Sequence, residues 1–451
     1  MPLFVIDTHL CVPRRARDTI TRLREKYRRP NPKYQSAQRM GYATRGIPPW
    51  IELAAEDNGV VRFPREAVHE LPKGVRIENR TSLGQAVDLG TPIRLRDYQR
   101  EPVERTLAEL ERFHGGVLQA QAGFGKTVAA LEIARRLGRK TLVLVHTSFL
   151  MTQWRDRIQQ FLGVSVGTIQ QDVIDTDHPI VLAMIQTVIN RDLPQHLVEQ
   201  FGLVISDECH RVSCESWRES IVCFPATYRL GISATPKRQD GLEWVFQAHI
   251  GPVVVVGESV LDEPEIYLVP TPVGRIPAPT NRMGKPDFVA TVSLLSEHDR
   301  RNQQIAGYIQ EAVGKNRKII VFSDRRAHLE DLAKRFERGC EKCGIEADYG
   351  FFVGGMSEAG RAAASERQVI FSTFQFAREG LDVAALDTCM LATPKGDVVQ
   401  AVGRIQRALP GKPHPVVLDF VDDGIGVCRG LARRRLRQYR AQGWTVHDWR
   451  D

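Results

Sequence analysis

One short segment, residues 120–127, limits this chain to a small set of folds. It reads Ala-Gln-Ala-Gly-Phe-Gly-Lys-Thr, follows an apolar stretch at 117–119, and opens a stretch at 127–137 in which apolar residues recur at helical spacing. A glycine-containing turn between a buried strand and a helix lets backbone N–H groups converge on phosphate oxygens. The segment therefore predicts a parallel α/β sheet with a phosphate-binding loop at the carboxyl end of one strand.

Strand-like and helix-like stretches alternate along most of the chain. Apolar stretches at 141–145, 181–184, 203–206 and 229–233 predict further strands, and a second series starts at 318–322. Prolines at 264, 270, 272, 277, 279 and 286 separate the two series. Because strands that alternate with helices form parallel sheets, we predict two tandem α/β domains at 91–258 and 291–451. A linker at 259–290 would join them, and a small accessory domain at 1–90 would precede them.

Positive charge is concentrated near the N-terminus. The net charge is +8, and residues 11–40 alone supply it, with ten Lys/Arg against two acids (10 − 2). Tyr27, Tyr34, Tyr42 and Trp50 are interleaved with these cations, and a second basic stretch spans 429–440. Basic segments attract polyanions, and aromatic rings stack on bases. This pattern predicts that the accessory domain binds nucleic acid and selects the substrate; the alternative is a solvated basic face with buried aromatics.

The residues of the loop and of a later acidic pair indicate nucleotide chemistry. In the loop, the backbone of Ala120, Gln121, Ala122, Gly123, Phe124 and Gly125 would surround phosphate, and Lys126 would contact the β- and γ-phosphates. Asp207-Glu208-Cys209-His210 follows the apolar stretch 203–206. Thr127 and Asp207 would hold Mg²⁺, and Glu208 would polarise the attacking water. Together they predict an ATP hydrolysis site with ATP and Mg²⁺ as cofactors.

Further motifs follow in a fixed order, and with them the chain resembles the superfamily 2 helicases over about residues 92–422. They are Leu95-Arg96-Asp97-Tyr98-Gln99, His146-Thr147 with Gln153-Trp154, Ile185-Gln186-Thr187, the DExH form at 207–210, Ser233-Ala234-Thr235-Pro236, Phe322-Ser323-Asp324-Arg325, Thr373 with Glu379-Gly380-Leu381-Asp382, and Gln400-Ala401-Val402-Gly403-Arg404-Ile405-Gln406-Arg407. The resemblance is closest to the branch that includes XPB-like and phage UvsW-like DNA helicases. It implies that both α/β domains are RecA-like.

The resemblance also implies a role for each motif residue. Gln99 would contact adenine, and Gly380 and Asp382 would lie at the nucleotide. Gln400, Arg404 and Arg407 would act on the γ-phosphate from the second domain, although Ala401 replaces an arginine of many relatives. Ser233 and Thr235 would couple hydrolysis to movement. Contacts to nucleic acid would come from Thr147, Gln186, Thr187, Ser323, Arg325 and Thr373.

These expectations lead to an ATP-dependent DNA helicase or translocase acting on single-stranded, forked or branched DNA in repair, recombination or replication. Residues 234–241 favour DNA, but an RNA helicase remains an alternative, as does a nucleic-acid-binding scaffold with a vestigial ATP site. The acid pair Asp422-Asp423 is interpreted as a strand-end loop rather than a nuclease site. No signal peptide or membrane-spanning stretch is evident. We therefore expect a cytoplasmic protein, associated with nucleoid or viral DNA and with no membrane partner.

Overall fold

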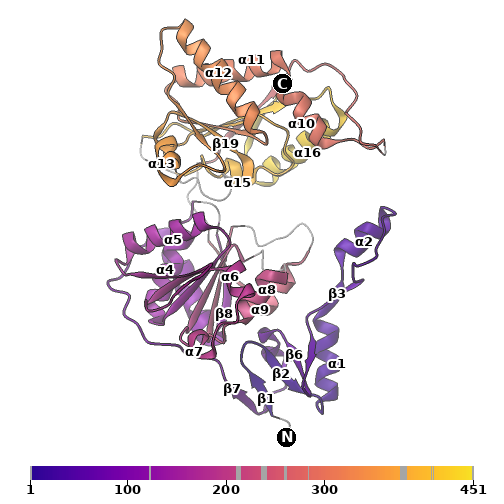
Figure 1. Ribbon diagram of the computed structural model, residues 1–451, viewed down its shortest axis with the longest axis vertical. Helices are drawn as coiled ribbons and strands as arrows, with labels where there is room; N and C mark the ends of the chain where they lie inside the picture. The colour runs from indigo at the N-terminus through magenta and orange to yellow at the C-terminus, as the bar shows by residue number, and fades with distance from the viewer. Residues whose placement is uncertain are drawn as a thin grey trace. The chain divides into compact units, whose positions relative to one another are not determined.

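Two compact units make up the chain, residues 1–259 and 260–451, and each is described by itself. The computed structural model describes residues 3–120, 123–209, 215–234, 241–257, 262–282, 284–375, 383–407, 409 and 411–448. Both units contain an extended sheet with helices on its faces (Figure 1). Within the described ranges, no helix is both long and apolar enough to cross a lipid bilayer.

The N-terminal region forms a small sheet of its own. Its strands lie in the order β5 (Ala55–Asp57), β6 (Val60–Phe63), β2 (Leu10–Pro13), β1 (Phe4–Ile6) and β7 (Ile77–Asn79). β1 and β7 run parallel, and the other neighbours run antiparallel. α1 (Arg17–Lys26) and the 3₁₀ helix η1 (Arg65–Glu70) accompany this sheet. Its core of Leu10, Val12 and Phe63 also includes Trp244 and Val245 from α9 (Glu243–Ile250), so it packs on the first α/β domain.

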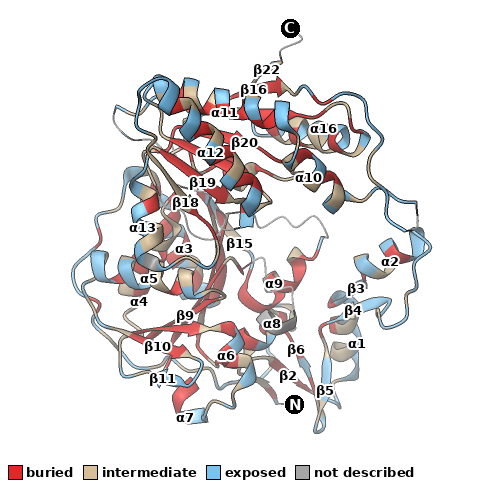
Figure 2. Cartoon of the chain, turned by 45° about the horizontal axis from the view of Figure 1, so that its top comes forward, coloured by how far each residue is buried: buried red, intermediate tan, exposed pale blue. Residues whose placement is uncertain are grey.

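An arm, residues 28–52, leaves the small sheet between α1 and β5. Its two strands, β3 (Arg28–Pro30) and β4 (Trp50–Glu52), pair antiparallel, and α2 (Pro32–Arg39) lies between them in sequence. The side chain of Asn31 accepts a bond from the Lys33 N–H at 3.0 Å and donates to the Pro48 carbonyl at 2.9 Å. This asparagine therefore caps α2 and ties the returning loop to it. Most residues of the arm are exposed (Figure 2).

Two buried arginines join the accessory region to the first α/β domain. Arg229 of the large sheet donates to the carbonyls of Thr8 at 3.0 Å and His249 at 2.8 Å. Arg65 of η1 donates in the opposite direction, to the carbonyls of Ala226 at 2.6 Å and His114 at 3.1 Å. Since buried polar groups are stable only when bonded, these bonds fix the accessory region against the sheet.

The first large sheet has the order β11-β10-β12-β9-β13-β14-β8-β15, and all its neighbours are parallel except β10 and β11. Its strands are β8 (Gly115–Ala120), β9 (Thr141–Val145), β10 (Val166–Gln170), β11 (Val173–Asp175), β12 (Ile180–Met184), β13 (Leu203–Asp207), β14 (Tyr228–Ser233) and β15 (Val253–Gly257). Its helices are α3 (Asp97–Phe113), α4 (Lys126–Leu137), α5 (Ser148–Phe161), α6 (Ile185–Asn190), α7 (Gln195–Val198), α8 (Glu215–Val222) and α9.

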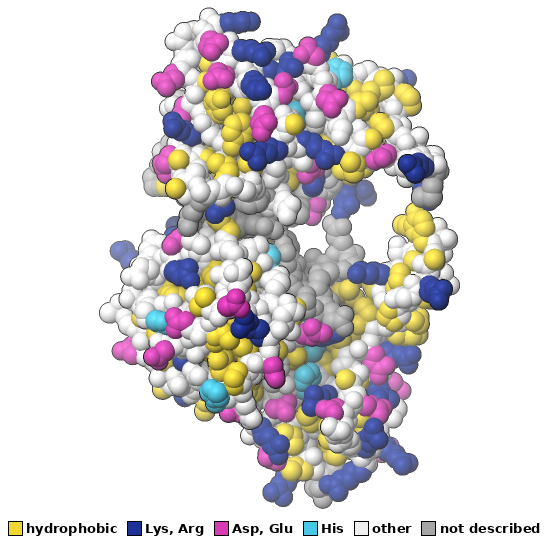
Figure 3. Space-filling model, viewed as in Figure 1, with side chains coloured by type: hydrophobic (Ala, Val, Ile, Leu, Met, Phe, Trp, Pro, Cys, Tyr) yellow, Lys and Arg dark blue, Asp and Glu magenta, His cyan; other side chains and the backbone are white. Residues whose placement is uncertain are grey.

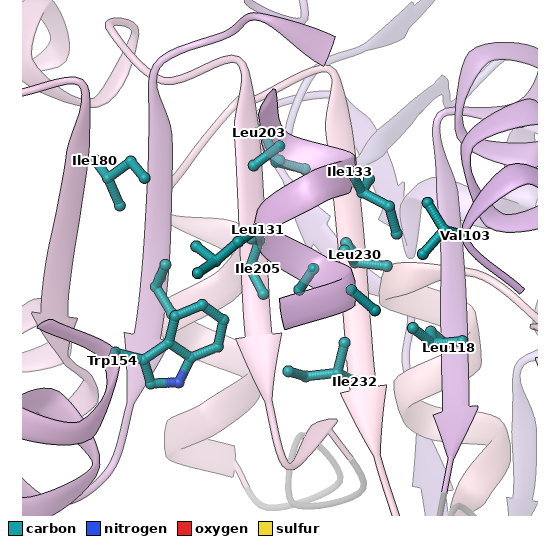
Figure 4. Packing of buried hydrophobic residues seen from close by; sticks show 14 of the residues in the cluster. Val103, Leu118, Leu131, Ile133, Trp154, Ile180, Leu203, Ile205, Leu230 and Ile232 are labelled. Atoms are coloured by element: carbon teal, nitrogen blue, oxygen red, sulfur yellow. The ribbon is translucent and has the colours of Figure 1, made fainter. Parts of the chain in front are cut away.

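Hydrophobic clusters cover both faces of this sheet. Successive strand residues point to opposite faces: Ile205 joins the cluster with Leu131 of α4 and Trp154 of α5, while Val204 joins the cluster with Phe246 of α9. Figure 4 shows the first of these clusters, with α4 lying across the strands. Burial on both faces of the sheet thus explains why its strands are apolar at successive positions instead of alternating with polar residues.

The second unit holds a sheet in which every neighbouring pair is parallel, in the order β18-β19-β17-β20-β21-β16-β22. Its strands are β16 (Glu265–Pro270), β17 (Ile319–Ser323), β18 (Tyr349–Phe352), β19 (Val369–Thr373), β20 (Thr388–Leu391), β21 (Val416–Val421) and β22 (Thr445–Asp448). Its helices are α10 (Phe288–Ser296), α11 (Asp299–Gly314), α12 (Arg326–Lys342), α13 (Glu358–Glu366), α15 (Val399–Val402) and α16 (Gly426–Ala441).

The segment 259–290, predicted to be a linker, is partly a strand. β16 lies inside it and is hydrogen-bonded between β21 and β22, with Ile266 fully buried. The prolines that suggested a linker stand at the limits of this strand: Pro264 precedes it and Pro270 is its last residue. A proline at a strand end removes no interior ladder bond. The second sheet therefore begins earlier than residue 291.

Candidate nucleotide and nucleic-acid sites

Three adjacent parallel strands end at the candidate nucleotide site. β14 lies between β8 and β13, with Ser233 opposite Gln119 and Asp207 opposite Ile232. Two strand spacings separate the ends of β8 and β13, a distance of about 10 Å. The structure thus brings the loop that contains Lys126 and the acidic pair that begins at Asp207 to one edge of the sheet, where open parallel sheets bind ligands.

Backbone geometry and a buried ring set the shape of the phosphate loop. Gly123 and Gly125 have φ angles of 88° and 85°, in the left-handed region that favours glycine. Between them, Phe124 is fully buried, with its ring centroid 5.5 Å from that of Tyr98. A β-carbon on Gly257, at the end of β15, would lie 2.7 Å from the Phe124 ring. Phe124 therefore anchors the loop in the core while the glycines provide its turns.

Gln99, which the resemblance assigns to adenine, holds the loop from a second direction. Its side chain is buried; Nε2 donates to the Phe124 carbonyl at 2.6 Å, and Oε1 accepts a backbone N–H at the start of α3 at 2.9 Å. A β-carbon on Gly125 would lie 2.6 Å from that Nε2, so any larger residue would displace the glutamine. Lys126 Nζ donates to the Ala120 carbonyl at 3.1 Å, which closes the loop on its own strand.

Asp207 is buried at the end of β13 and receives its hydrogen bonds from neutral donors. The backbone N–H of Glu208 donates to Oδ1 at 2.9 Å, and the indole Nε1 of Trp154 donates to Oδ2 at 2.9 Å. Burial and the neighbouring Glu208 carboxylate raise the pKa of Asp207 to about 6, while Trp154 and Lys126 oppose this shift. Among the described residues, the carboxylate is therefore oriented by these two bonds and forms no ion pair with a cation.

Residues 208 and 209 turn the chain away from β13. Glu208 is half-buried and has a φ of 51°, which is uncommon for a residue with a side chain. Cys209 is fully buried, and a β-carbon on Gly231 of β14 would lie 3.0 Å from its Sγ. Burial also raises the pKa of the Cys209 thiol well above its usual range. Cys209 is thus a packing residue, and Asp207 and Glu208 remain the residues of this motif that are predicted to act on the nucleotide.

These residues fit a nucleotide with Mg²⁺. Oxygen ligands suit that ion, and the residues offer the Asp207 carboxylate at the end of β13 and the half-buried Thr127 hydroxyl in the first turn of α4. Burial and then the Glu208 carboxylate raise the pKa of Asp207, and a divalent cation would oppose that shift. The positive-φ glycines and Lys126 supply the donors that phosphate requires.

In the second unit, the arginine motif lies on α15 and the turn after it. Gln400, Arg404 and Arg407 are each half-buried, and Ala401, where many relatives carry arginine, is buried in the helix. Lys412 Nζ donates to the carbonyls of residues 405 and 407 at 2.6 and 2.5 Å. Burial lowers the pKa of this ammonium group. Lys412 therefore fixes the turn that carries both arginines.

Among the residues expected to contact nucleic acid in the first unit, exposure differs sharply. Gln186 is exposed at the start of α6, and Thr147 is half-buried as the N-cap of α5, where its hydroxyl accepts the Leu150 N–H at 3.2 Å. Thr187 is buried, and its hydroxyl accepts the Gln171 N–H at 2.9 Å. The Thr187 hydroxyl is therefore already bonded within the fold, at the neighbouring strand end, and its contact with phosphate stays a prediction.

The second unit repeats this division. Ser323, at the end of β17, is fully buried; its hydroxyl bonds His328 Nδ1 at 3.0 Å and accepts the Arg325 N–H at 3.1 Å. Ser323 therefore organises the start of α12, and its contact with nucleic acid stays a prediction. Arg325 is half-buried and donates to α10, at the Val289 carbonyl at 3.2 Å. Thr373, at the end of β19, is half-buried.

Some of the expected site residues cannot be placed. Gln121, Ala122, Thr235, Gly380 and Asp382 lie outside the described residues. Ser233, expected to couple hydrolysis to movement, is fully buried at the end of β14, between the strands that lead to the phosphate loop and the acidic pair.

Two residues at these sites have roles that the sequence did not reveal. Trp154 was grouped with the nucleic-acid motif, but it is 1% exposed and lies in the core of the sheet (Figure 4), where its indole N–H donates to Asp207. Met151, Trp154 and Ile158 have the i, i+3, i+7 spacing of a buried helix face. This pattern would have predicted that the indole points into the core. Lys412 follows the arginine motif but belongs to no recognisable motif itself. Its bonds to the carbonyls of residues 405 and 407 were therefore not predictable.

Comparison with known sequences agrees with this geometry. Residues 92–238 match the family described as "Type III restriction enzyme, res subunit". The "Putative ATP-dependent RNA helicase L396" of Acanthamoeba polyphaga mimivirus is 28% identical over 362 residues, which cover 79% of this chain and 69% of that protein. The "DNA 3'-5' translocase XPB2" of Sulfurisphaera tokodaii is 35% identical over 162 residues, which cover 36% of this chain and 35% of that protein.

Comparison with solved structures supports the fold. The Mycobacterium smegmatis helicase Lhr, bound to ssDNA and AMP-PNP, superposes with a TM-score of 0.54 at 18% identity, over 78% of this chain and 51% of that one. The predicted fold class, two tandem RecA-like α/β domains, is confirmed by the parallel sheets together with such neighbours.

Proposed function

We propose that this chain, a superfamily 2 helicase closest to the XPB-like and UvsW-like branch, is a DNA translocase driven by ATP hydrolysis. The observation that carries the proposal is that a phosphate loop and an acidic pair follow the two strands that flank β14, at the same edge of one sheet. The helicase relatives support ATP use and nucleic-acid binding. The choice of DNA, of its forked or branched forms, and of each residue's role belongs to the proposal.

At the nucleotide, we assign each residue one task. Lys126 and the N–H groups of the loop bind the β- and γ-phosphates, and Thr127 and Asp207 hold Mg²⁺, which when bound neutralises developing charge on the phosphates. Glu208 accepts a hydrogen bond from the attacking water and so orients it. Trp154 keeps Asp207 in a fixed rotamer through its indole N–H.

Turnover would also need the second unit. We propose that Gln400, Arg404 and Arg407 reach the γ-phosphate only when ATP draws the two domains together, and that hydrolysis releases them. An arginine supplied in this way is worth about 10³–10⁵ in rate in other nucleotide hydrolases. Ordered closure and release, with strand contacts on both domains, would move the chain along a sugar–phosphate backbone.

On the polymer side, Thr147, Gln186, Arg325 and Thr373 are the expected residues with exposed or half-buried side chains. Contacts of this type go to phosphates and carry no sequence information. Residues 234–241 and the relative named a DNA translocase favour DNA. The relative named an RNA helicase makes RNA the second candidate.

The test is ATP hydrolysis measured without nucleic acid, and then with single-stranded DNA, blunt duplex, forked DNA and RNA of matched sequence. We expect strong stimulation by DNA and the largest effect on forks. Lys126→Ala and Glu208→Gln are expected to abolish it, with Glu208→Gln still binding ATP because the phosphate loop is unchanged.

Stimulation by RNA alone would reassign the polymer. Stimulated turnover that persists in Glu208→Gln would overturn the assigned chemistry, and a wild-type protein that no strand stimulates would favour a scaffold with a vestigial site.

A further inference from the structure

We infer that the arm, residues 28–52, is a second nucleic-acid contact, which stacks its aromatic side chains on unpaired bases where a duplex opens. The inference depends on the proposed function for its polymer class. It lies outside the nucleotide site and outside the motif residues expected to grip the strand. Four observations on the arm support it: its charge, its exposed apolar side chains, its internal bonding and its attachment.

Every charged side chain of the arm before its last residue, Glu52, is positive. Between residues 28 and 51 there is no Asp or Glu, and five cations are exposed: Arg28, Arg29, Lys33, Arg39 and Arg45. In the described chain none of these five pairs with a carboxylate, whereas Arg14 and Arg24 outside the arm both bond Glu56. Cations that the protein does not neutralise itself are suited to a polyanion.

Large apolar side chains are exposed on the same arm. Met40, Tyr42 and Trp50 are 64%, 51% and 45% exposed. The guanidinium carbon of Arg28 lies over the Trp50 ring, 4.8 Å from its centroid, so a cation and an exposed ring are in contact on the arm. Hydrophobic and Lys/Arg side chains occur together over this part of the molecule (Figure 3). Rings combined with cations are the pattern of a base-stacking platform.

Internal bonds hold the arm in shape without a ligand. Besides the Asn31 bonds and the β3–β4 pair, the Tyr42 N–H donates to the Ala37 carbonyl at 2.8 Å, and the Ile47 N–H to the Thr44 carbonyl at 3.0 Å. A surface that is already ordered loses little conformational entropy on binding. At its base, Arg29 lies over the Trp244 ring of α9, 4.9 Å from the centroid, which fixes the arm to the first domain.

Unpaired bases are the occupant that this chemistry favours. Inside a duplex both faces of each base are covered by neighbouring pairs, whereas a fork or a single strand offers unpaired bases on which a ring can stack. An acidic protein surface would use the cations but would leave Trp50 and Tyr42 without a reason to be exposed.

The experiment measures binding without ATP, so that the motor plays no part. Trp50→Ala, Trp50→Phe and Val173→Ala are compared on forked DNA with 2-aminopurine at the first unpaired position, on a single strand, on a blunt duplex of the same sequence, and on polyglutamate. Val173 is the matched control because its exposure, 54%, is close to the 45% of Trp50, but it lies on β11.

We expect Trp50→Ala to weaken fork and single-strand binding about 5- to 100-fold and to remove the 2-aminopurine quenching. Trp50→Phe keeps most of both, Val173→Ala changes neither, and the blunt duplex changes less than about twofold. Unfolding midpoints that match the wild type show that Trp50→Ala is folded.

Equal weakening on blunt and forked DNA would overturn stacking and leave phosphate contact alone. Unchanged binding to every nucleic acid would overturn the site, as would a loss seen only with polyglutamate. If Trp50→Ala loses fork binding but no strand stimulates the wild-type ATPase, the arm stands and the proposed function fails.

Discussion

Asp207 in the first unit and Asp419 in the second are buried carboxylates on parallel strands, but their partners differ. Asp207 accepts from an indole and a backbone N–H, both neutral. Asp419, on β21, receives two bonds from Arg435 at 2.8 and 2.7 Å and one from the Tyr439 hydroxyl at 2.9 Å. In the part of the chain that the structure describes, the Asp207 carboxylate forms no ion pair, whereas the Asp419 carboxylate is paired with the Arg435 guanidinium.

A second acid of the second unit, at the end of β21, is also paired with an arginine. Asp422, which the sequence placed in a strand-end loop, is buried and receives two bonds from Arg301 at 2.8 and 3.1 Å. A neighbouring hydroxyl, that of Thr271, adds a third at 2.7 Å. An acid at the carboxyl end of a parallel strand is therefore not a site by position alone. The charge of its partners decides whether it binds a ligand or stabilises the fold.

The largest expected effect is on ATP turnover, which should depend on Asp207. Asp207→Asn keeps an acceptor for only one of its two donors, because the amide nitrogen cannot accept, so its free energy of unfolding should fall by about 1–3 kcal/mol. Because the charge that holds Mg²⁺ is lost, stimulated ATP turnover should fall by at least about 100-fold. Steady-state hydrolysis and urea unfolding measure the two quantities. Near-normal turnover would remove Asp207 from the site.

Asp419→Asn should reverse that outcome. It leaves Arg435 buried without its counter-charge, and breaking such a pair costs about 3–5 kcal/mol. We expect the free energy of unfolding of the second unit to fall by that amount, measured by urea denaturation. Replacing both partners, as in Asp419→Leu with Arg435→Met, should recover part of the loss. A single variant as stable as the wild type would show that the ion pair contributes little.

A smaller effect is expected at Trp154. Trp154→Phe keeps the ring in its packed position but removes the donor to Asp207. Changes to residues that orient a metal ligand typically cost 10- to 100-fold in metal affinity. The Mg²⁺ concentration needed to raise the unfolding midpoint in the presence of ATP should therefore increase by about 10-fold or more. Trp244→Phe, away from the site, is the control and should leave that concentration unchanged.

The smallest expected effect is on the pH dependence of stability, and it tests whether the buried His328 side chain is neutral in the folded protein. Burial, aided by Arg301, lowers the pKa of His328 to about 3 from 6.5. Between pH 3 and 6.5 the folded state thus binds fewer protons than the unfolded chain, so this contribution is complete above pH 6.5 and is lost as pH falls. His328→Asn should reduce the loss of stability between pH 7 and pH 5.5 by about 1 kcal/mol. Identical pH slopes in the two proteins would contradict this assignment.

Sequence reasoning could predict the candidate nucleotide site because its pattern is local. A turn with glycines at 123 and 125 needs no distant partner to be recognised, and an acidic pair after an apolar strand lies at a strand end wherever the strand is. Their meeting follows from parallel topology alone. β16 was missed because prolines at its two limits gave the stretch the composition of a linker.

Side-chain direction was the part that sequence could not give. Thr187 and Ser323 match motif positions, yet each bonds a partner brought near by tertiary structure, the Gln171 N–H and His328. A hydroxyl at a strand or helix end can turn toward solvent or toward its own fold, and only the neighbouring elements decide. The same holds for Gln99, whose amide supports the loop.

The two arginines that join the accessory region to the first domain have one more consequence. Arg229 and Arg65 donate to uncharged carbonyls and are shielded from solvent, so dissolved ions have little influence on their bonds. Contacts with phosphates weaken steeply as ionic strength rises. In concentrated salt the protein should release nucleic acid with its internal architecture intact, and on dilution it should bind again without refolding.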